Sequence, residues 1–276
     1  KTFINEVNDD VANFKGRVDA LDVKQKEFEA GGFSETTTMD GKVIFDIGAV
    51  DYSLASESKT EATLFGYSYT ANLNTSFTGD DNLYIRLKTG NHGGWMKDKD
   101  YGGYLGSVGK GSGAISVDKI WYQFPVGDYN TVWVGPKIEN YYMHGTAMSI
   151  YKPITKQFSL GGNGEAYGAS TDTGAGWAYK GDNGFAISSN VGTKSTTTNG
   201  QTGLLTNESK TSWATQVGLT KSQWSASVLL NQKYNGWGDD YYHSKEHAPS
   251  SSTGNFSSVG LRGWWRPLDT GVAVPS

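Results

Sequence analysis

The chain has 276 residues, with 24 Lys and Arg against 28 Asp and Glu, so its net charge of −4 provides no basic surface for nucleic acid. It contains no cysteine, which excludes disulfide scaffolds, thiol catalysis and cysteine-ligated zinc. No apolar run approaches the roughly 20 residues of a membrane helix, but a transmembrane β-strand needs only about 10 residues with alternate ones apolar. The composition therefore excludes a helical membrane protein and leaves both soluble β folds and membrane barrels open.

Residues 1–32 differ in kind from the rest of the chain. Apolar residues recur there at alternating steps of three and four, which predicts an amphipathic helix that ends at a glycine pair. The narrow apolar seam favours a short coiled coil that joins identical chains, and a helix packed on its own domain is the alternative. No signal peptide is visible, so we expect the natural chain to begin upstream. The seam comprises Ile4, Val7, Val11, Phe14, Val18, Leu21, Gln25 and Phe28.

From residue 33 to residue 276 the hydrophobic period is two, which predicts about ten β-strands and the start of an eleventh. Residues 82–88 show the pattern most clearly. Their aliphatic side chains share one face, and Tyr84, Arg86 and Lys88 share the other. A strand of this kind separates two different solvents. In a membrane barrel the apolar face meets lipid and the charged face lines a watery lumen.

Short turns alternate with long loops along the whole strand region. In an up-and-down barrel this places every short turn at one rim, as in outer-membrane barrels, whereas a Greek-key sandwich has no reason to keep the alternation. We therefore predict an all-β, transmembrane, antiparallel up-and-down barrel. It would be incomplete here, because an open edge after residue 272 would promote aggregation. The turns are predicted at 79–82, 127–130, 181–184, 221–223 and 267–271, and the loops at 53–60, 92–115, 143–172, 195–209 and 235–254.

Aromatic residues gather beside the short turns. At one rim they would form the interfacial girdle of a membrane barrel, although strands are rich in aromatic residues in any case. The residues are Phe77, Phe124, Tyr129, Trp177, Tyr179, Phe185, Trp224 and Trp265.

Charged residues opposite apolar neighbours are the candidate pore-lining residues. On a lipid face a Lys or Arg at mid-depth costs about 2–4 kcal/mol, so the alternation assigns these residues to the water-filled side. Basic members outnumber acidic ones, which predicts a mild anion preference. The candidates are Lys42, Asp46, Arg86, Lys88, Lys119, Lys137, Glu139 and Arg262.

The long segment 143–172 is the candidate for a loop that folds into the lumen and narrows the channel. The alternative is a loop that lies over the outer surface, as most loops do. The constriction candidates are Tyr142, His144, Lys152, Lys156 and Glu165.

No catalytic constellation stands out, and the sequence contains no P-loop, G-x-S-x-G or H-E-x-x-H motif. His243 and His247 lie near Asp239 and Asp240, but loop residues of these types are usually only solvated. We therefore predict a protein that is not an enzyme and has no metal site and no cofactor.

Three short stretches resemble a known family in combination: FPVGD at 124–128, TVWVGPK at 131–137 and LGGNG at 160–164. They are similar to cyanobacterial outer-membrane porins, which include Som-type, iron-uptake and OprB-like carbohydrate-selective porins. The resemblance extends over residues 33–46 and 259–267. It implies a homotrimeric diffusion channel in outer-membrane lipid. It also implies an N-terminal SLH domain, absent from this sequence, that binds peptidoglycan and is joined to the barrel by a periplasmic coiled coil.

The expected function is therefore passive diffusion of small inorganic ions and small hydrophilic solutes across an outer membrane of the Gram-negative type. A carbohydrate-selective or iron-uptake porin is the alternative. A sugar channel would need an aromatic track along the lumen, for which Tyr84, Trp121 and Trp133 are candidates. The second alternative is a soluble β-sandwich that binds glycans through loops such as residues 234–242.

Overall fold

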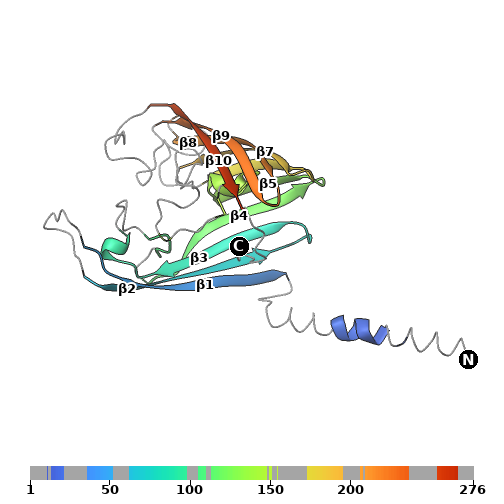
Figure 1. Cartoon of the computed structure of the whole chain (residues 1–276), viewed down its shortest axis with the longest axis horizontal. Coiled ribbons are helices and arrows are strands. Elements are labelled where there is room, and N and C mark those ends of the chain that lie inside the picture. The colour runs from blue at the N-terminus through green and yellow to red at the C-terminus, as the bar shows by residue number, and fades with distance from the viewer. Residues whose placement is uncertain are drawn as a thin grey trace, which may run out of the picture.

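The computed structural model describes residues 11, 14–21, 36–51, 62–97, 105–109, 113–147, 149–150, 154, 173–194, 206–207, 209–235 and 254–266. Within these ranges, ten antiparallel strands form one open sheet in which each strand pairs with the next along the chain (Figure 1). The predicted all-β, up-and-down architecture of ten strands is thus confirmed. A sandwich would divide the strands between two sheets. The start of an eleventh strand, predicted at 272–274, lies outside the described residues.

Two short 3-10 helices, η1 and η2, interrupt the connections between strands. The elements in chain order are β1 (Thr37–Gly48), β2 (Leu64–Thr75), β3 (Asn82–Gly90), η1 (Gly94–Lys97), β4 (Ser116–Val126), β5 (Asn130–Lys137), η2 (Asn140–Met143), β6 (Thr173–Lys180), β7 (Phe185–Thr193), β8 (Thr211–Thr220), β9 (Trp224–Tyr234) and β10 (Phe256–Trp265).

The predicted alternation of short and long connections is confirmed. Three to six residues join β2 to β3, β4 to β5, β6 to β7 and β8 to β9, and the intervening connections are all longer. The β6–β7 turn depends on Gly184, whose φ of +84° lies in the left-handed region. A Cβ at this position would lie 2.0 Å from the Thr220 carbonyl oxygen, so only glycine fits.

The two faces of the sheet differ in polarity, and β9 shows the difference most clearly. Ser225, Ser227 and Asn231 are buried on the face that we call the inner face. Trp224 and Val228, which alternate with them, are exposed on the outer face.

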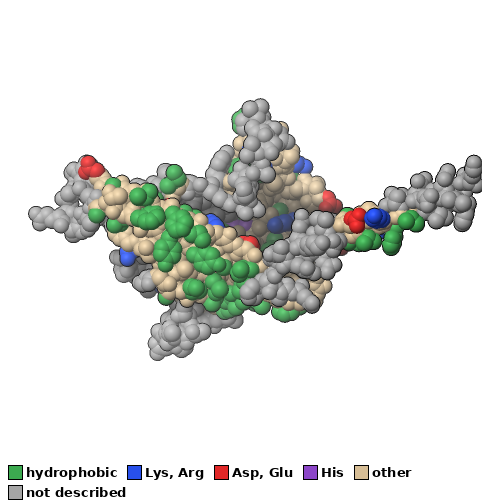
Figure 2. All heavy atoms as spheres, turned by 90° about the horizontal axis from the view of Figure 1, so that it is seen from below, with side chains coloured by type: hydrophobic (Ala, Val, Ile, Leu, Met, Phe, Trp, Pro, Cys, Tyr) green, Lys and Arg blue, Asp and Glu red, His purple; other side chains and the backbone are tan. Residues whose placement is uncertain are grey.

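Apolar side chains dominate the outer face of β1 and β2. Val43, Phe45, Ile47 and Phe65 are all more than half exposed. Figure 2 looks toward this side of the molecule, and hydrophobic side chains gather over the sheet there. The outer face thus exposes a group of large apolar side chains of the kind that marks a contact with protein or membrane.

The N-terminal seam is described only in part. Residues 11 and 14–21 are helical, and Val11, Phe14, Val18 and Leu21 are all exposed. These four side chains therefore do not pack on the sheet. The alternative, a helix docked on its own domain, requires that they do. In the described portion of the chain, no helix has the length and apolar character needed to span a membrane.

Aromatic rings form a row beside the short turns. The ring centroids of Phe77 and Tyr122 lie 6.4 Å apart, and those of Tyr129 and Tyr179 lie 5.9 Å apart. At the β9–β10 end of the row, Trp224 and Trp265 are paired in register. The structure thus brings residues from many strands to one rim, as predicted.

The β2–β3 turn closes around the carboxylate of Asp81. The backbone N–H groups of Phe77 and Thr78 and the hydroxyls of Ser76 and Thr78 donate to one carboxylate oxygen at 2.8–2.9 Å. The Tyr122 hydroxyl donates to the other oxygen at 2.6 Å. These hydrogen bonds, that of Tyr122 foremost, hold the pKa of Asp81 well below its usual range, against the opposing effect of burial.

At the opposite end of the sheet, His92 holds the loop after β3 against β1. Its Nδ1 accepts the backbone N–H of Gly109 at 3.1 Å, so its Nε2 carries the proton and donates to Asp46 at 2.8 Å. The hydroxyl of Ser107 also donates to Asp46, at 2.7 Å. Because Ser107 bonds to the carboxylate and not to the imidazole, the three side chains do not form a nucleophile–base pair.

Candidate functional site

The first described part of the connection between β5 and β6 lies along the inner face of the sheet. Residues 138–147, which include η2, form what we call the infolded segment. It contacts β6 and β7 through η2, and Ile138 and Met143 are completely buried. The sequence placed such a loop at 143–172, and the structure shows that the described infolded part begins five residues earlier.

Uncharged hydrogen bonds hold one side of the infolded segment to β7 and β8. The backbone N–H of Gly145 donates to the Ser188 hydroxyl at 2.9 Å. The amide of Gln216 binds Thr146 at both ends, because it accepts the backbone N–H at 2.9 Å and donates to the carbonyl at 3.4 Å. The side chain of Asn140 donates to the side chain of Asn190 and to a β8 carbonyl.

Glycines make the wall beneath these bonds flat enough for backbone to approach. A Cβ at Gly176 would lie 2.9 Å from the Met143 sulfur and 2.6 Å from the Cβ of Asn190. A Cβ at Gly218 would lie 2.7 Å from the Thr146 methyl group. The infolded segment therefore fits only a wall without side chains at these positions.

Charged groups hold the other side of the infolded segment to β3 and β4. Arg86 donates from Nε to Asp118 at 2.6 Å and also pairs with it through Nη2, while its Nη1 donates to the Tyr142 hydroxyl at 2.8 Å. Lys119 pairs with Glu139 at 3.2 Å. Both members of the second pair are largely buried, so the charges lie in an environment that screens them weakly.

A β-bulge explains how Asp118 reaches Arg86. Strict alternation places Asp118 on the face opposite Lys119. In the structure, Arg86 pairs with Lys119 but the next residue of β3 pairs with Val117, so Asp118 is the extra residue of a bulge. The alternation was therefore wrong at Asp118. A bulge leaves no clear mark in the local pattern, which is why Asp118 was missed as a site residue.

The three aromatic residues predicted to face inward do so, but they do not form an open track. Tyr84 stacks on Trp121 at 4.1 Å between centroids, and Tyr142 of the infolded segment packs on Trp121 at 4.6 Å. Trp121 is only 5% exposed and Trp133 only 6%. These rings form the floor on which the infolded segment rests, so a solute has no access to the faces of Trp121 and Trp133.

The burial that seals this aromatic floor also affects the tyrosines above it. Burial raises the pKa of Tyr142, and it raises the pKa of Tyr141 well above its usual value. Both phenols therefore stay protonated and neutral through the physiological range.

Among the remaining predicted pore residues, Lys42, Lys88 and Arg262 lie on the inner face by alternation. A register shift between β4 and β5 instead pairs Lys137 with Ile120 of the outer face, so alternation fails at Lys137. Lys42 is exposed. Lys137 is also exposed and donates to the Val117 carbonyl at 2.8 Å. Lys88 and Arg262 are partly buried. Glu139 was predicted to continue the strand, but β5 ends at Lys137, and Glu139 lies in the infolded segment directly before η2.

The constriction candidates also divide. Tyr142 and His144 lie on the infolded segment, and both contact the wall, His144 through the Asn190 amide at 3.2 Å. His144 is buried, so it anchors the segment. Lys152, Lys156 and Glu165 lie outside the described residues.

A row of amides and one carboxylate crosses the inner face of β1–β3 near the short turns, and no local sequence pattern marks it. The amides of Asn72 and Asn74 donate to Asp40 at 2.6 and 3.4 Å. The Asn82 amide donates to Asn74, and the Tyr84 hydroxyl donates to Asn72. The row offers polar groups of the kind that bind hydroxyls, half open to the interior.

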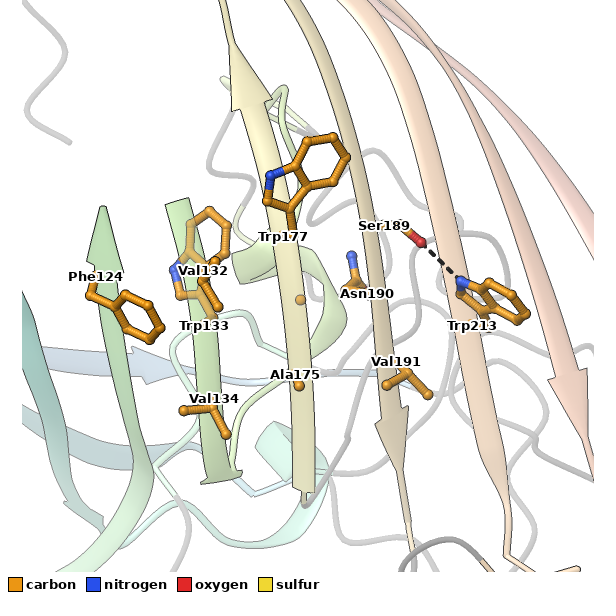
Figure 3. A pocket seen from close by; sticks show the side chains of 11 residues that line it. Phe124, Val132, Trp133, Val134, Ala175, Trp177, Ser189, Asn190, Val191 and Trp213 are labelled. Atoms are coloured by element: carbon orange, nitrogen blue, oxygen red, sulfur yellow. Dashed lines mark hydrogen bonds between the residues drawn. The ribbon is translucent and has the colours of Figure 1, made fainter. Parts of the chain in front are cut away.

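A hollow on the outer face has a different character (Figure 3). Val132, Val134, Trp177, Val191 and Trp213 line it, and the indole N–H of Trp213 is already bound to Ser189. Apolar rings and methyl groups therefore form its surface. Its two polar lining side chains, Ser189 and Asn190, are already hydrogen-bonded to other residues, so the hollow offers a hydrophilic solute few partners.

No group of three or more His, Cys, Asp or Glu residues that could hold a metal ion is found in the part of the chain that the structure describes. The loop pair His243 and His247 lies outside the described residues.

Comparison with known proteins points to a channel family. A family model described as "Carbohydrate-selective porin, OprB family" matches residues 3–260. The chain is also similar to "Uncharacterized protein alr4550" of Nostoc sp. (strain PCC 7120), with 31% identity over 132 residues, which cover 44% of this chain and 23% of that relative. The chain thus spans under a quarter of the relative's length. Because the family model covers the N-terminal seam and the strands from β1 into the first half of β10, the chain belongs to the OprB family of carbohydrate-selective porins.

Proposed function

We propose that this chain forms most of the wall of an outer-membrane pore for passive diffusion of small hydrophilic solutes and small inorganic ions. The observation that carries the proposal is the separation of the two faces over ten strands. The outer face exposes aliphatic and aromatic side chains, and the inner face carries polar and charged ones. Membership in a porin family supports the same conclusion.

Closure of the open sheet into a barrel is part of the proposal. The edges of β1 and β10 each pair with one neighbour among the described strands. Closure would pair both edges, because bacterial barrels of one chain close on themselves. The aromatic row at the short-turn rim would then lie at the periplasmic membrane interface.

The N-terminal seam supports the second part of the proposal, a homotrimer. Val11, Phe14, Val18 and Leu21 have the spacing of a coiled-coil seam, and all are exposed. A parallel coil of residues 1–32 in the periplasm would bury them between identical chains. Attachment to peptidoglycan through an upstream SLH domain follows from the resemblance to cyanobacterial porins and is proposed on that basis.

Planar-bilayer recording from the detergent-purified, full-length protein tests the proposal. We expect stepwise currents in groups of three and, in a salt gradient, a reversal potential that indicates mild anion preference. Absence of channels from correctly folded protein would overturn the proposal.

Selective passage of sugars is the second candidate function. The family description favours it, and so does the polar row of Asp40, Asn72, Asn74 and Asn82. Such discrimination would come from hydrogen bonds to hydroxyls, because Trp121 and Trp133 are covered. Addition of sugars to the same bilayer separates the two functions: saturable block of the ion current indicates a sugar site, and an unblocked current indicates general diffusion.

A further inference from the structure

Arg86 faces the interior, and by charge alone it would act as a selectivity residue. Its hydrogen bonds indicate otherwise. Three of its nitrogens are engaged, two with Asp118 and one with the Tyr142 hydroxyl. The side chains of Arg86 and Asp118 are only 21% and 26% exposed. A passing ion therefore meets a shielded pair of opposite charges, whose fields largely cancel beyond a few ångströms.

The Tyr142 hydroxyl is the point where the infolded segment meets β3. On its far side, the same segment is bound to β7 and β8 through Asn140, Gly145 and Thr146. The Tyr142 ring also rests on Trp121, so its hydroxyl is directed to Arg86 by packing as well as by the hydrogen bond. Arg86 thus joins a strand on one side of the interior to a segment anchored on the other side.

We infer that Arg86 is a positioning residue that sets the width of the pore by fixing Tyr142 and the infolded segment, and that it does not select ions by charge. The inference rests on the proposed function as a pore. The exposed cations of the inner face, such as Lys42, then provide the anion preference.

The geometry of the guanidinium makes the inference specific to arginine. Nε and Nη2 bind one carboxylate while Nη1 reaches the phenol, an arrangement that requires a planar fork of donors. A lysine at this position keeps the positive charge, but its single ammonium group cannot hold Asp118 and Tyr142 in the same fixed geometry. Charge-based selectivity would survive Arg86→Lys, whereas positioning of the infolded segment would not.

Three variants of the full-length protein separate width from charge in planar bilayers. Tyr142→Phe removes only the acceptor hydroxyl and changes no charge. Arg86→Lys keeps the charge and loses the fork, and Arg86→Gln loses both. We expect all three to raise the single-channel conductance and the open-channel noise, with the reversal potential of the first two equal to that of the wild type.

Two control variants match these changes elsewhere. Tyr129→Phe removes a phenol hydroxyl that donates to Asp182 at 2.9 Å at the short-turn rim, and it should leave conductance unchanged. Lys42→Gln removes an inner-face charge that does not touch the infolded segment, and it should shift the reversal potential without raising conductance. Heat-modifiable gel mobility confirms that each variant is folded, and Tyr142→Phe tests the inference alone if the Arg86 variants fail to fold.

The outcomes are distinct. A shifted reversal potential with unchanged conductance in Arg86→Gln, together with wild-type behaviour of Tyr142→Phe and Arg86→Lys, overturns the inference and makes Arg86 a charge filter. Wild-type protein without channels overturns the proposed function itself.

Discussion

On the β3–β4 side, two ion pairs and an aromatic stack hold the infolded segment, whereas on the β6–β8 side uncharged amides, a hydroxyl and glycine backbone hold it. On the charged side, both members of each ion pair must be present. A largely buried charge that loses its partner costs several kcal/mol of stability. On the neutral side, close packing matters most, because the infolded segment contacts β6 and β8 only where glycines leave room for it. Variants on the two sides should therefore differ in kind.

The comparison also shows why a bare count of inner charges misjudges the interior. Arg86 and Lys119 were counted as free cations in predicting anion preference, yet each is paired with a carboxylate. Some inward-facing charges, such as Arg86 and Lys119, are therefore bound in ion pairs that hold the infolded segment. Only charges outside these pairs can attract a passing ion.

The largest expected effect comes from breaking the charged side at Lys119. Lys119→Met leaves Glu139 largely buried without its cation, and we expect a loss of about 3 kcal/mol in unfolding free energy. The double variant Lys119→Met/Glu139→Gln removes both charges and should recover most of that loss. Urea unfolding followed by gel mobility measures both. Equal destabilisation in the single and double variants would show that the ion pair itself contributes little on this side.

An intermediate effect is expected from the neutral side at Gly176. Gly176→Ala brings a methyl group against Met143 and Asn190, and we expect a loss of about 1–3 kcal/mol through overpacking, with a rise in single-channel conductance as the segment lifts. Gly93→Ala is the matched control, since a Cβ there meets no atom within 4 Å. If both alanine variants behaved alike, the flat wall would not be required for the infolded segment.

The smallest effect should come from acid acting on the β2–β3 turn, outside both sides. The folded pKa of Asp81 is depressed, so its stabilising effect is complete above the unfolded pKa of about 3.9 and declines as pH falls toward the folded value. Between about pH 6 and pH 2, the wild type should therefore lose more stability than Asp81→Asn. Unfolding midpoints across this range provide the measurement, and parallel pH profiles for the two proteins would contradict the assignment.

Most of the fold could be predicted from sequence because the period-two pattern is local. The ten strands, the alternation of short and long connections and the aromatic row all follow from residue type and spacing. The site was less predictable. Tyr142 and Glu139 were named, but strict alternation puts Asp118 on the face opposite the one that the bulge gives it. Asn140, Gly176 and Gln216 gave no signal of contact with a segment distant in sequence.

By itself, the sequence determined which face of each strand is apolar, since side chains alternate along any extended chain. Only the tertiary structure decided which inner charges are paired, which aromatic rings are covered and where the infolded segment lies. These outcomes depend on register between strands and on a segment that returns to the sheet. Hydrogen bonds such as Arg86 to Tyr142 and Gln216 to Thr146 join residues 56 and 70 positions apart, beyond the reach of any local pattern.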